Sequence, residues 1–323
     1  MENNKSKNII IAGGGISGLT MLHYLKKKYA DRPDVHIRLF EAQGRLGGKI
    51  FSEINQHGLF EYAASGFLNA EDSTRNLALE LGLESELIQA DPQAKLRYLS
   101  LMHKLHPFPT QPFGLLKFAP LSFLEKMRIF QEIFVNRGND PDESIYDFGK
   151  RRFGQPFAEY FLDPMVSGIF GGDIRQLHLK SVFPKIAELE QTHGSLIKAM
   201  FKLKKKKNSP KSVGQPKGSL TSFKKGMFQL IQALENHYQE FIQNSEAVEQ
   251  IEPVKDGYKI QSKKAEYLAD EIYICTAAKE AAQLVLNLSI QLADLLRKIT
   301  YVPIAVVGLV YERSSLTQIP KGF

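Results

Sequence analysis

Three glycines near the N-terminus have the spacing of a turn that binds phosphate. Gly13, Gly15 and Gly18 follow the apolar residues 8–12 and precede a stretch of helical character at residues 19–29. The first glycine permits a tight turn, the second lets the backbone approach a pyrophosphate, and the third allows close packing of helix on strand. The helix N-terminus then offers N–H groups and a positive dipole end to the anion. The pattern predicts dinucleotide binding, with a purely structural glycine turn as the alternative.

An acidic residue completes the pattern at the end of the next strand. Residues 35–40 are predicted as a strand and lead into Glu41, which lies 28 residues after Gly13. Its carboxylate would accept hydrogen bonds from the ribose hydroxyls of adenosine and would repel a 2′-phosphate. Residues 8–41 therefore have the order and length of one β-α-β unit, the minimal dinucleotide-binding module.

The segment after Glu41 favours a flavin over a nicotinamide dinucleotide. It contains Arg45, Gly47, Gly48 and Lys49, an order that resembles the Arg-x-Gly-Gly-Arg/Lys signature of the amine-oxidase-like FAD superfamily. The resemblance implies FAD, with the glycines along the diphosphate and the basic residues near the phosphates or the flavin; ordinary solvated charges in a turn are the alternative. The cofactor-binding residues that it implies are Gly13, Gly15, Ser17, Gly18, Glu41, Ala42, Arg45, Gly47, Gly48, Lys49, Ala63, Ala64, Ser65, Gly66 and Val248.

Further stretches resemble the protoporphyrinogen/coproporphyrinogen oxidase family, in the same order along the chain. They are residues 97–99, 105–109, 143–148, 151–154, 163–173, 220–227 and 301–307. The resemblance implies oxidation of a porphyrinogen, either protoporphyrinogen IX or coproporphyrinogen III, to the porphyrin in haem biosynthesis. Hydride would pass to flavin N5, and oxygen or another acceptor would reoxidise the flavin.

The resemblance also implies a broad apolar site with one or two cations for the substrate propionates. Arg97 is the candidate for propionate pairing, because a guanidinium binds a carboxylate through two hydrogen bonds; a solvent-facing arginine is the alternative. Gly171 and Gly172 would let the backbone pass close to the macrocycle and the flavin, unless they only form a turn between helices. We assign no catalytic residue, because the flavin carries the chemistry. The spacing of His103 and His106 does not converge on a metal, so no metal site is expected.

The chain departs from the family pattern at several places. Ala63 and Ala64 lie in the segment where the family has Gly-Pro or Gly-Ala, Lys225 replaces a glycine, and Ala278 replaces a proline. The chain also stops at residue 323, where the family continues. We therefore expect a C-terminally truncated chain, such as a fragment or one product of a split gene.

The composition is that of a globular protein with a locally concentrated positive charge. Hydrophobic residues make up 43% and charged residues 24% of the chain, which excludes disordered and fibrous classes. The net charge of +7 comes from residues 191–234, which contain ten lysines and no acidic residue; the remainder carries −3. No aromatic platform accompanies the lysines, so we expect a solvated loop and no nucleic-acid partner.

The location and the partners are hypotheses from the same composition. A single cysteine, Cys275, allows no intrachain disulfide and fits a reducing compartment. No secretory signal or spanning segment is visible, so we expect a cytoplasmic protein. The lysine-rich loop and the Phe/Leu-rich residues 108–134 support the hypothesis of peripheral contact with the cytoplasmic membrane. A homodimer is a further hypothesis.

The predicted fold class is α/β: a Rossmann-like FAD-binding domain interrupted by a mixed α+β substrate domain and a helical segment. Residues 71–90 are predicted as a helix, residues 122–201 as mostly helical, and the β-branched run 304–311 as a strand. The FAD-binding domain is predicted to consist of residues 1–70 and 219–285, and the substrate domain of residues 71–110 and 286–323. Between them lie the helical segment (111–200) and the lysine-rich loop (201–218).

Two other functions stay open from the sequence. One is another amine-oxidase-like flavoenzyme, either an amine oxidase or a desaturase, because the glycine turn and the segment after Glu41 are shared by that superfamily. The other is a truncated, inactive protein with an FAD fold.

Overall fold

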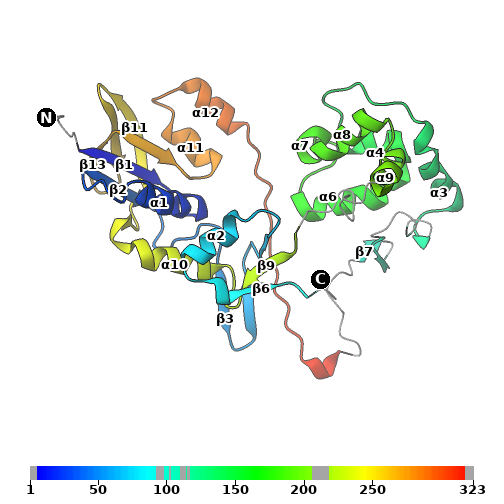
Figure 1. Ribbon diagram of the computed structural model, residues 1–323, viewed down its shortest axis with the longest axis horizontal. Coiled ribbons are helices and arrows are strands. Elements are labelled where there is room, and N and C mark those ends of the chain that lie inside the picture. Colours follow the sequence, from blue (N-terminus) through cyan, green and yellow to red (C-terminus); the bar gives the residue numbers. More distant parts are fainter. Residues whose placement is uncertain are drawn as a thin grey trace. The chain divides into compact units, whose positions relative to one another are not determined.

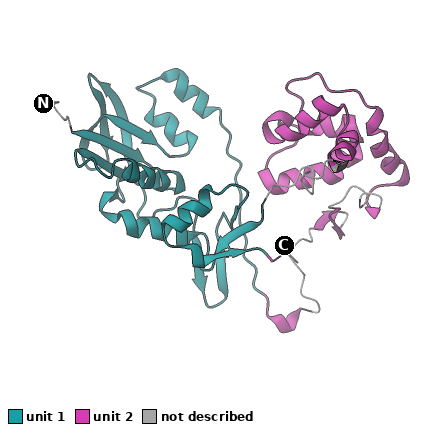
Figure 2. Ribbon diagram, viewed as in Figure 1, with its two compact units in different colours: residues 1–90, 218–310 teal, residues 91–217, 311–323 magenta. Residues whose placement is uncertain are grey.

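The computed structural model describes residues 6–91, 98–101, 103–109, 114, 117–205 and 218–316. The chain divides into two compact units (Figure 2). Unit 1 consists of residues 1–90 and 218–310, and unit 2 of residues 91–217 and 311–323. Unit 1 is therefore built from two stretches of sequence with unit 2 between them in the chain.

A parallel sheet of four strands forms the centre of unit 1, in the order β10-β2-β1-β14. Ile9 of β1 lies opposite Ile37 of β2 on one side and Glu271 of β14 on the other. β1 is apolar over most of its length, as expected of a central parallel strand whose two faces are both covered. The strands are β1 (Lys7–Ala12), β2 (Val35–Phe40), β10 (Ile242–Gln243) and β14 (Glu271–Ile274).

Two helices cover one face of this sheet, and a second sheet covers the other (Figure 1). Side chains of β1 alternate between the faces: Ile9 and Ile11 pack with α1 and α10, whereas Ile10 packs with Ile251 and Ile260 of the second sheet. This second sheet is antiparallel, in the order β11-β12-β13. The elements are α1 (Ile16–Lys28), α10 (Phe228–Tyr238), β11 (Val248–Val254), β12 (Gly257–Ser262) and β13 (Glu266–Ala269).

Smaller elements complete unit 1. A hairpin pairs β3 with β4, and a three-stranded sheet has the order β5-β9-β6. These elements are β3 (Ser52–Asn55), β4 (Gly58–Glu61), β5 (Phe67–Leu68), α2 (Ser73–Glu80), η1 (Glu84–Glu86), β6 (Leu87–Gln89), β9 (Leu220–Phe223), η5 (Gln239–Phe241), α11 (Ala278–Leu284) and α12 (Ile290–Arg297).

Two predicted elements of unit 1 are wrong. The helix expected at residues 71–90 ends at Glu80, because Gly82 adopts a left-handed φ of 72° and Leu87 pairs with Phe223 in a strand. The β-branched run 304–311 forms no strand and is exposed. Within the described residues, no neighbouring strand accepts or donates backbone hydrogen bonds along this run, and a strand without a partner is not stable.

Unit 2 is mainly helical, as predicted for residues 122–201. Its core contains Phe118, Ile129 and Phe157 in one cluster and Ile145 and Val166 in another. The elements are the hairpin β7 (Tyr98–Leu101) and β8 (Lys104–Pro107), then α3 (Phe123–Phe130), η3 (Gln131–Phe134), α4 (Ile145–Phe153), α5 (Gln155–Phe157), the π-helix η4 (Ala158–Leu162), α6 (Asp163–Phe170), α7 (Leu179–Val182), α8 (Pro184–His193), α9 (Leu196–Lys205) and η6 (Arg313–Ser315).

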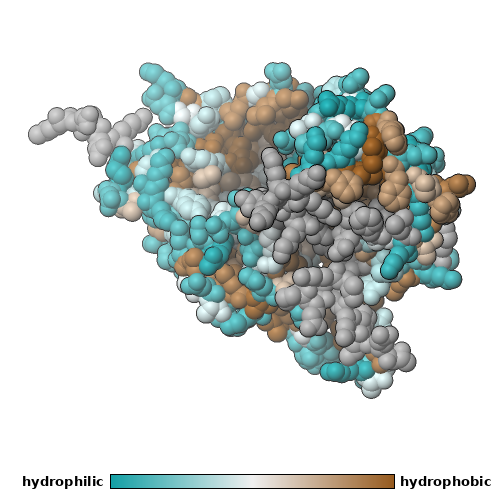
Figure 3. Space-filling model, turned by 45° about the vertical axis from the view of Figure 1, so that its right-hand side comes forward, coloured by the Kyte–Doolittle hydropathy of each residue, from teal (hydrophilic) through white to brown (hydrophobic). Residues whose placement is uncertain are grey.

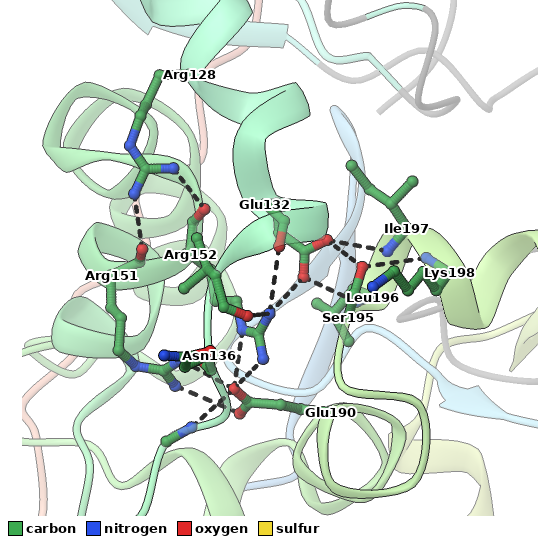
Figure 4. A network of polar contacts seen from close by, with 12 residues as sticks. Arg128, Glu132, Asn136, Arg151, Arg152, Glu190, Ser195, Leu196, Ile197 and Lys198 are labelled. Atoms are coloured by element: carbon green, nitrogen blue, oxygen red, sulfur yellow. Dashed lines mark hydrogen bonds and ion pairs between the residues drawn. The ribbon is translucent and has the colours of Figure 1, made fainter.

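A buried ionic network joins four segments of unit 2 (Figure 4). Arg152 is fully buried and lies between Glu132 and Glu190, which are also buried. Its guanidinium donates to Glu132 Oε1 at 2.9 Å and, through Nε, to Glu190 Oε1 at 2.8 Å. Glu132 in turn accepts from the Ser195 hydroxyl at 2.5 Å and from the Leu196 N–H at 2.8 Å, so that it caps the N-terminus of α9. The network therefore ties η3, α4, α8 and α9 together.

The second arginine of the network extends it toward the surface. Arg151 pairs with Glu143 at 2.7 Å and with Glu190 at 2.9 Å. Burial opposes the ionisation of Glu190, but hydrogen bonds from Arg151 and Arg152 outweigh it and hold the pKa of Glu190 below its usual value. Glu190 therefore stays ionised to a lower pH than an ordinary glutamate.

The boundaries of the compact units differ from those of the predicted segments. Residues 71–90 and 286–310 belong to the same unit as residues 1–70, and residues 91–110 belong to unit 2. Which segments contact the substrate stays a prediction.

Among the described residues, no helix is both long and apolar enough to span a bilayer.

Candidate cofactor site

The glycine turn connects β1 to α1, and two of its glycines are required by the packing. Gly13 has a left-handed φ of 109°, and a Cβ added there would lie 2.9 Å from the Cys275 carbonyl oxygen. A Cβ on Gly18 would lie 1.9 Å from the Gly13 carbonyl oxygen. Both positions therefore need glycine for the fold itself, as predicted from the requirements of a tight turn and close helix packing.

Gly15 differs from its neighbours because it faces open space. A Cβ added to Gly15 would meet no atom within 4 Å. Gly15 is the N-cap of α1, no side chain caps this helix, and its first turn contains no acidic residue. The first N–H groups of α1 are therefore available for an anion at the positive end of the helix dipole. The turn fits a dinucleotide diphosphate: it is packed where the fold needs it and open where a ligand would lie.

Glu41 follows β2 at the same edge of the sheet and is held by two backbone groups. Its Oε2 accepts from the Gly14 N–H at 2.7 Å, and its Oε1 accepts from the Gln43 N–H at 2.8 Å. Each carboxylate oxygen has a further lone pair, so that the group can still accept from ribose hydroxyls. The two bonds fix the carboxylate beside the glycine turn, which is the arrangement expected for adenosine binding. Ala42 follows directly and is exposed.

The segment of residues 45–49 lies against the glycine turn. The Gly47 N–H donates to the Gly14 carbonyl at 2.8 Å, and Gly15 and Gly47 form an isolated parallel bridge. Gly47 and Gly48 have left-handed φ values of 96° and 55°, which other residues rarely adopt. The two glycine motifs, separated by about one β-α-β unit, thus form a single backbone cradle.

The two basic residues of this segment have different surroundings. The Arg45 guanidinium donates to the carbonyls of Leu46 and Gly48 at 2.9 Å and lies 4.7 Å from the centre of the Phe51 ring. Arg45 therefore holds the loop in shape. Lys49 is exposed, with its Nζ 5.0 Å from the centre of the Tyr301 ring. A role of either side chain toward phosphate stays a prediction.

The remaining predicted cofactor residues lie in unit 1. Gly66 packs tightly on β9, because a Cβ there would be 2.7 Å from the Thr221 carbonyl oxygen. Ala63 and Ser65 are exposed and Ala64 is half-buried in the loop between β4 and β5. Val248 begins β11 and packs on the core cluster that includes Phe40. Ser17 is exposed in the first turn of α1.

The predicted substrate residues belong to the stretch of chain assigned to unit 2. Arg97 lies outside the described residues. Gly171 and Gly172 belong to unit 2, where Gly171 ends α6 in a left-handed conformation with φ 64°. A Cβ on Gly172 would be 3.1 Å from the Leu177 side chain, so this glycine has a packing role. Their function toward a substrate stays a prediction.

Sequence reasoning missed Gly14 and the N-terminus of α10. Gly14 is buried, and a Cβ there would be 2.5 Å from Leu46 and 3.0 Å from Glu41. The Met227 N–H donates to the Glu61 carboxylate at 2.8 Å, and the Phe228 N–H donates to the Ser52 hydroxyl oxygen at 2.9 Å. Only the run of three glycines could have indicated Gly14, and no motif indicated the capping pair.

In the portion of the chain that the structure describes, no group of three or more His, Cys, Asp or Glu could hold a metal.

A parallel sheet with a glycine turn after its first strand, an uncapped helix behind it and an acid after its second strand is the arrangement of the Rossmann-like class of folds. The chain belongs to the family of flavin-containing amine oxidoreductases, whose model matches residues 16–320. The α/β fold class predicted from the sequence is confirmed by this match, and a flavin is the class of cofactor that the family implies.

Curated relatives in this family are porphyrinogen oxidases. The chain is 31% identical to human protoporphyrinogen oxidase, over 96% of this chain and 68% of the human protein. It is 28% identical to chloroplastic protoporphyrinogen oxidase 1 of Arabidopsis thaliana, over 95% of this chain and 59% of the relative. It is 32% identical to coproporphyrinogen III oxidase of Staphylococcus aureus, over 71% of this chain and 51% of the relative. The chain thus spans between 51% and 68% of the length of these relatives.

Solved structures share the fold. A candidate protoporphyrinogen oxidase from Exiguobacterium matches with a TM-score of 0.76 at 22% identity, over 91% of this chain and 64% of that chain. Cyclohexylamine oxidase from Brevibacterium oxydans matches with a TM-score of 0.60 at 16% identity, over 91% of this chain and 63% of that chain. At these identities the likeness concerns the fold alone.

Proposed function

We propose that this chain binds FAD, with the adenosine diphosphate half at the glycine turn and Glu41. The observation that carries the proposal is the open, uncapped N-terminus of α1 at Gly15, next to a carboxylate held in place by two backbone N–H groups. A diphosphate placed there would accept hydrogen bonds from the first turn of α1. The ribose hydroxyls would donate to Glu41. Gly47 and Gly48 would keep the second loop close to the diphosphate without a side chain in the way.

We further propose that the protein oxidises a porphyrinogen to the porphyrin in haem biosynthesis. The support is the set of curated relatives, which are protoporphyrinogen and coproporphyrinogen oxidases by name. A bound flavin would supply the redox chemistry, which is hydride acceptance from the substrate with reoxidation by oxygen or another acceptor. The protein holds the dinucleotide, and Arg97 would pair with a substrate propionate.

The activity is tested by mixing the FAD-loaded protein with protoporphyrinogen or coproporphyrinogen under air. We expect porphyrin fluorescence to develop faster than the spontaneous oxidation, together with oxygen uptake. The Gly15→Ala variant is the matched control, since its Cβ meets no protein atom but would occupy the space of the diphosphate. Fluorescence at the spontaneous rate from a protein that retains FAD would contradict the proposed substrate.

The same assay separates the two remaining alternatives. Reduction of the bound flavin by an amine, with no response to a porphyrinogen, would indicate an amine oxidase. A protein that binds no flavin under any of these conditions would be an inactive member of the fold. The amine oxidases among the matched solved structures share only the fold with this chain.

We also propose that the protein is cytoplasmic and contacts the membrane surface through unit 2. α3 exposes Phe123, Leu124 and Met127, at 75%, 78% and 46%, and Phe134 of the adjoining η3 is 85% exposed. Hydrophobic residues at the surface are brown in Figure 3. An apolar helix face of this kind can lie at the interface of a bilayer. Sedimentation with anionic vesicles at low salt tests the proposal, and equal recovery with and without vesicles would contradict it. We also propose that the protein forms a homodimer, and light scattering, which measures its molar mass in solution, tests this proposal.

A further inference from the structure

One edge of the parallel sheet of unit 1 is open along most of β2. β10 pairs with β2 only at Leu39 and Phe40. In the portion of the chain that the structure describes, no strand pairs with this edge at residues 35–38. The Val35 N–H donates to the Arg32 carbonyl at 3.1 Å, so the unpaired stretch begins after that group. An edge whose backbone groups lack a neighbouring strand can accept a further strand.

A pocket of about 540 Å³ lies along this open edge and is named the β2 pocket below. Residues 35–38 of β2 line it, together with the last turns of α1 and the residues between α1 and β2. Residues 240, 241 and 243, from η5 and β10, complete the lining. The β2 pocket is therefore the space between β2 and η5, before the chain joins the sheet as β10 at Leu39.

The two faces of β2 give the β2 pocket two kinds of surface, because side chains alternate along a strand. Val35 and Ile37 face the helices that cover the sheet, where Tyr29 and Phe241 also pack and line the pocket. His36 and Arg38 point to the opposite face and are exposed. One side of the open edge is thus apolar and aromatic, and the other carries basic side chains.

Two cations of the β2 pocket are held by aromatic rings. The half-buried Lys26 has its Nζ 3.7 Å from the centre of the Phe241 ring, and the Arg38 Cζ lies 5.4 Å from the centre of the Tyr267 ring. Within the described residues, neither cation pairs with a carboxylate. An aromatic ring attracts a cation without neutralising its charge. Both cations can therefore still pair with an anion that enters the pocket.

The other charged groups leave the β2 pocket with an excess of positive charge. The Arg32 guanidinium donates to the two Asp34 carboxylate oxygens at 2.9 and 2.7 Å, so this pair contributes no net charge. Glu240 is the one carboxylate among the lining residues, and it is exposed. It stands against the two cations, Lys26 and Arg38. The pocket therefore favours an acidic ligand.

We propose that the β2 pocket binds an acidic segment of a partner protein as a strand added to β2. An added strand gains main-chain hydrogen bonds along the open edge, and its side chains alternate between the two faces of the sheet. Carboxylates at every second position would meet His36 and Arg38, and the apolar side chains between them would meet Tyr29 and Phe241. The same cations oppose pairing of this edge with that of a second copy, because like charges across a strand pair are destabilising. The proposal does not depend on the FAD site.

The probe is the peptide acetyl-Glu-Val-Glu-Val-Glu-amide, which has carboxylates on one face and apolar groups on the other when it is extended. Isothermal titration calorimetry at low salt measures its binding to the purified chain. We expect one peptide per chain, and an affinity that falls as salt is added. The peptide with every backbone nitrogen methylated keeps the side chains but has no N–H donors. It should bind about tenfold or more weakly, because each main-chain hydrogen bond contributes about twofold to tenfold in affinity.

Three variants test the side chains of the β2 pocket. Lys26→Gln and Arg38→Gln should each weaken binding of the acidic peptide by about twofold to fivefold, as expected for an exposed ion pair. Lys255→Gln is the matched control, since it removes one exposed positive charge from the turn between β11 and β12, outside the pocket. It should leave the affinity unchanged. An unaltered melting temperature of each variant shows that it is folded.

Four results would overturn the proposal. The unmodified chain could fail to bind the acidic peptide, which requires no variant to fold. The methylated peptide could bind as tightly as its parent, in which case attraction between charges acts without strand addition. Lys26→Gln and Arg38→Gln could bind like Lys255→Gln, which would place the peptide elsewhere. Finally, inorganic phosphate could displace the peptide at an equal concentration, which would make the pocket a site for small anions.

Discussion

The glycine turn offers two substitutions of the same size with opposite expected effects. Gly15→Ala adds a Cβ that meets no protein atom within 4 Å, at φ −72° and ψ 179°, which alanine adopts readily. Restricting the unfolded chain gains about 0.4–1 kcal/mol, and alanine is a poorer N-cap than glycine, so the two effects offset one another. Gly18→Ala places its Cβ 1.9 Å from the Gly13 carbonyl oxygen, and overpacking of this kind costs about 1–3 kcal/mol.

FAD binding should be affected mainly by Gly15→Ala, whereas stability should be affected mainly by Gly18→Ala. In Gly15→Ala the new methyl group would occupy the space in front of α1 and displace the diphosphate from its N–H donors. Losing one charge-assisted hydrogen bond costs about 1.5–3 kcal/mol, so FAD binding should weaken by about ten- to a hundredfold. Gly18→Ala should instead lower the melting temperature by about 2–12 °C. Fluorescence titration and thermal unfolding of both variants test this. FAD binding by Gly15→Ala with the affinity of the unmodified chain would refute the reasoning.

Four further predictions concern the site and the network of unit 2. Arg152→Met should destabilise unit 2 by about 3–5 kcal/mol, measured by urea unfolding, because it leaves the buried Glu132 without its cationic partner and Glu190 with Arg151 alone; a change below about 1 kcal/mol would contradict this. The pKa of Glu190 is lower in the folded protein than in the unfolded chain, where it is about 4.3. This difference stabilises the folded protein above the unfolded pKa, and the stabilisation is lost as the pH falls through the lower folded pKa. Glu190→Gln should flatten that region of the pH–stability curve, and an unchanged curve would argue against this reasoning. Glu41→Ala should weaken FAD binding by about tenfold or more, with a smaller effect on FMN, which has no adenosine; equal losses for the two flavins would speak against ribose binding. Arg97→Ala should raise KM for the porphyrinogen by about tenfold with little change in kcat if it pairs with a propionate; unchanged steady-state kinetics would exclude the pairing.

The sequence predicts the nucleotide-binding region of the fold well because its signals are local. Gly13 directly follows β1 and Gly18 lies in the first turn of α1, and a steric requirement at each position leaves little choice of residue. Glu41 lies at the end of the second strand for the same reason: in a parallel sheet the carboxyl ends of neighbouring strands meet at one edge. The contact between Gly15 and Gly47 could not be predicted from spacing alone, since it depends on how the second loop folds back.

Other features depend on contacts that the sequence does not encode locally. The run 304–311 has the composition of a strand, but strand formation depends on a partner, and none lies beside it among the described residues. The helix predicted over residues 71–90 has only eight residues, because residues 87–89 pair with β9, which is distant in sequence. The Arg152 network and the buried Asn244 Oδ1, which has no hydrogen-bond partner among the described residues, arise only from tertiary packing, so no sequence motif predicts them.

The most direct test of the central claim is a titration of the purified 323-residue chain with FAD and, separately, with FMN. The glycine turn and Glu41 bind the adenosine diphosphate half of the cofactor in this account. We therefore expect one FAD per chain, bound at least about tenfold more tightly than FMN, because FMN cannot use Glu41. Equal affinity for FAD and FMN, or no retention of either flavin, would contradict the account of the glycine turn and Glu41 as a dinucleotide site.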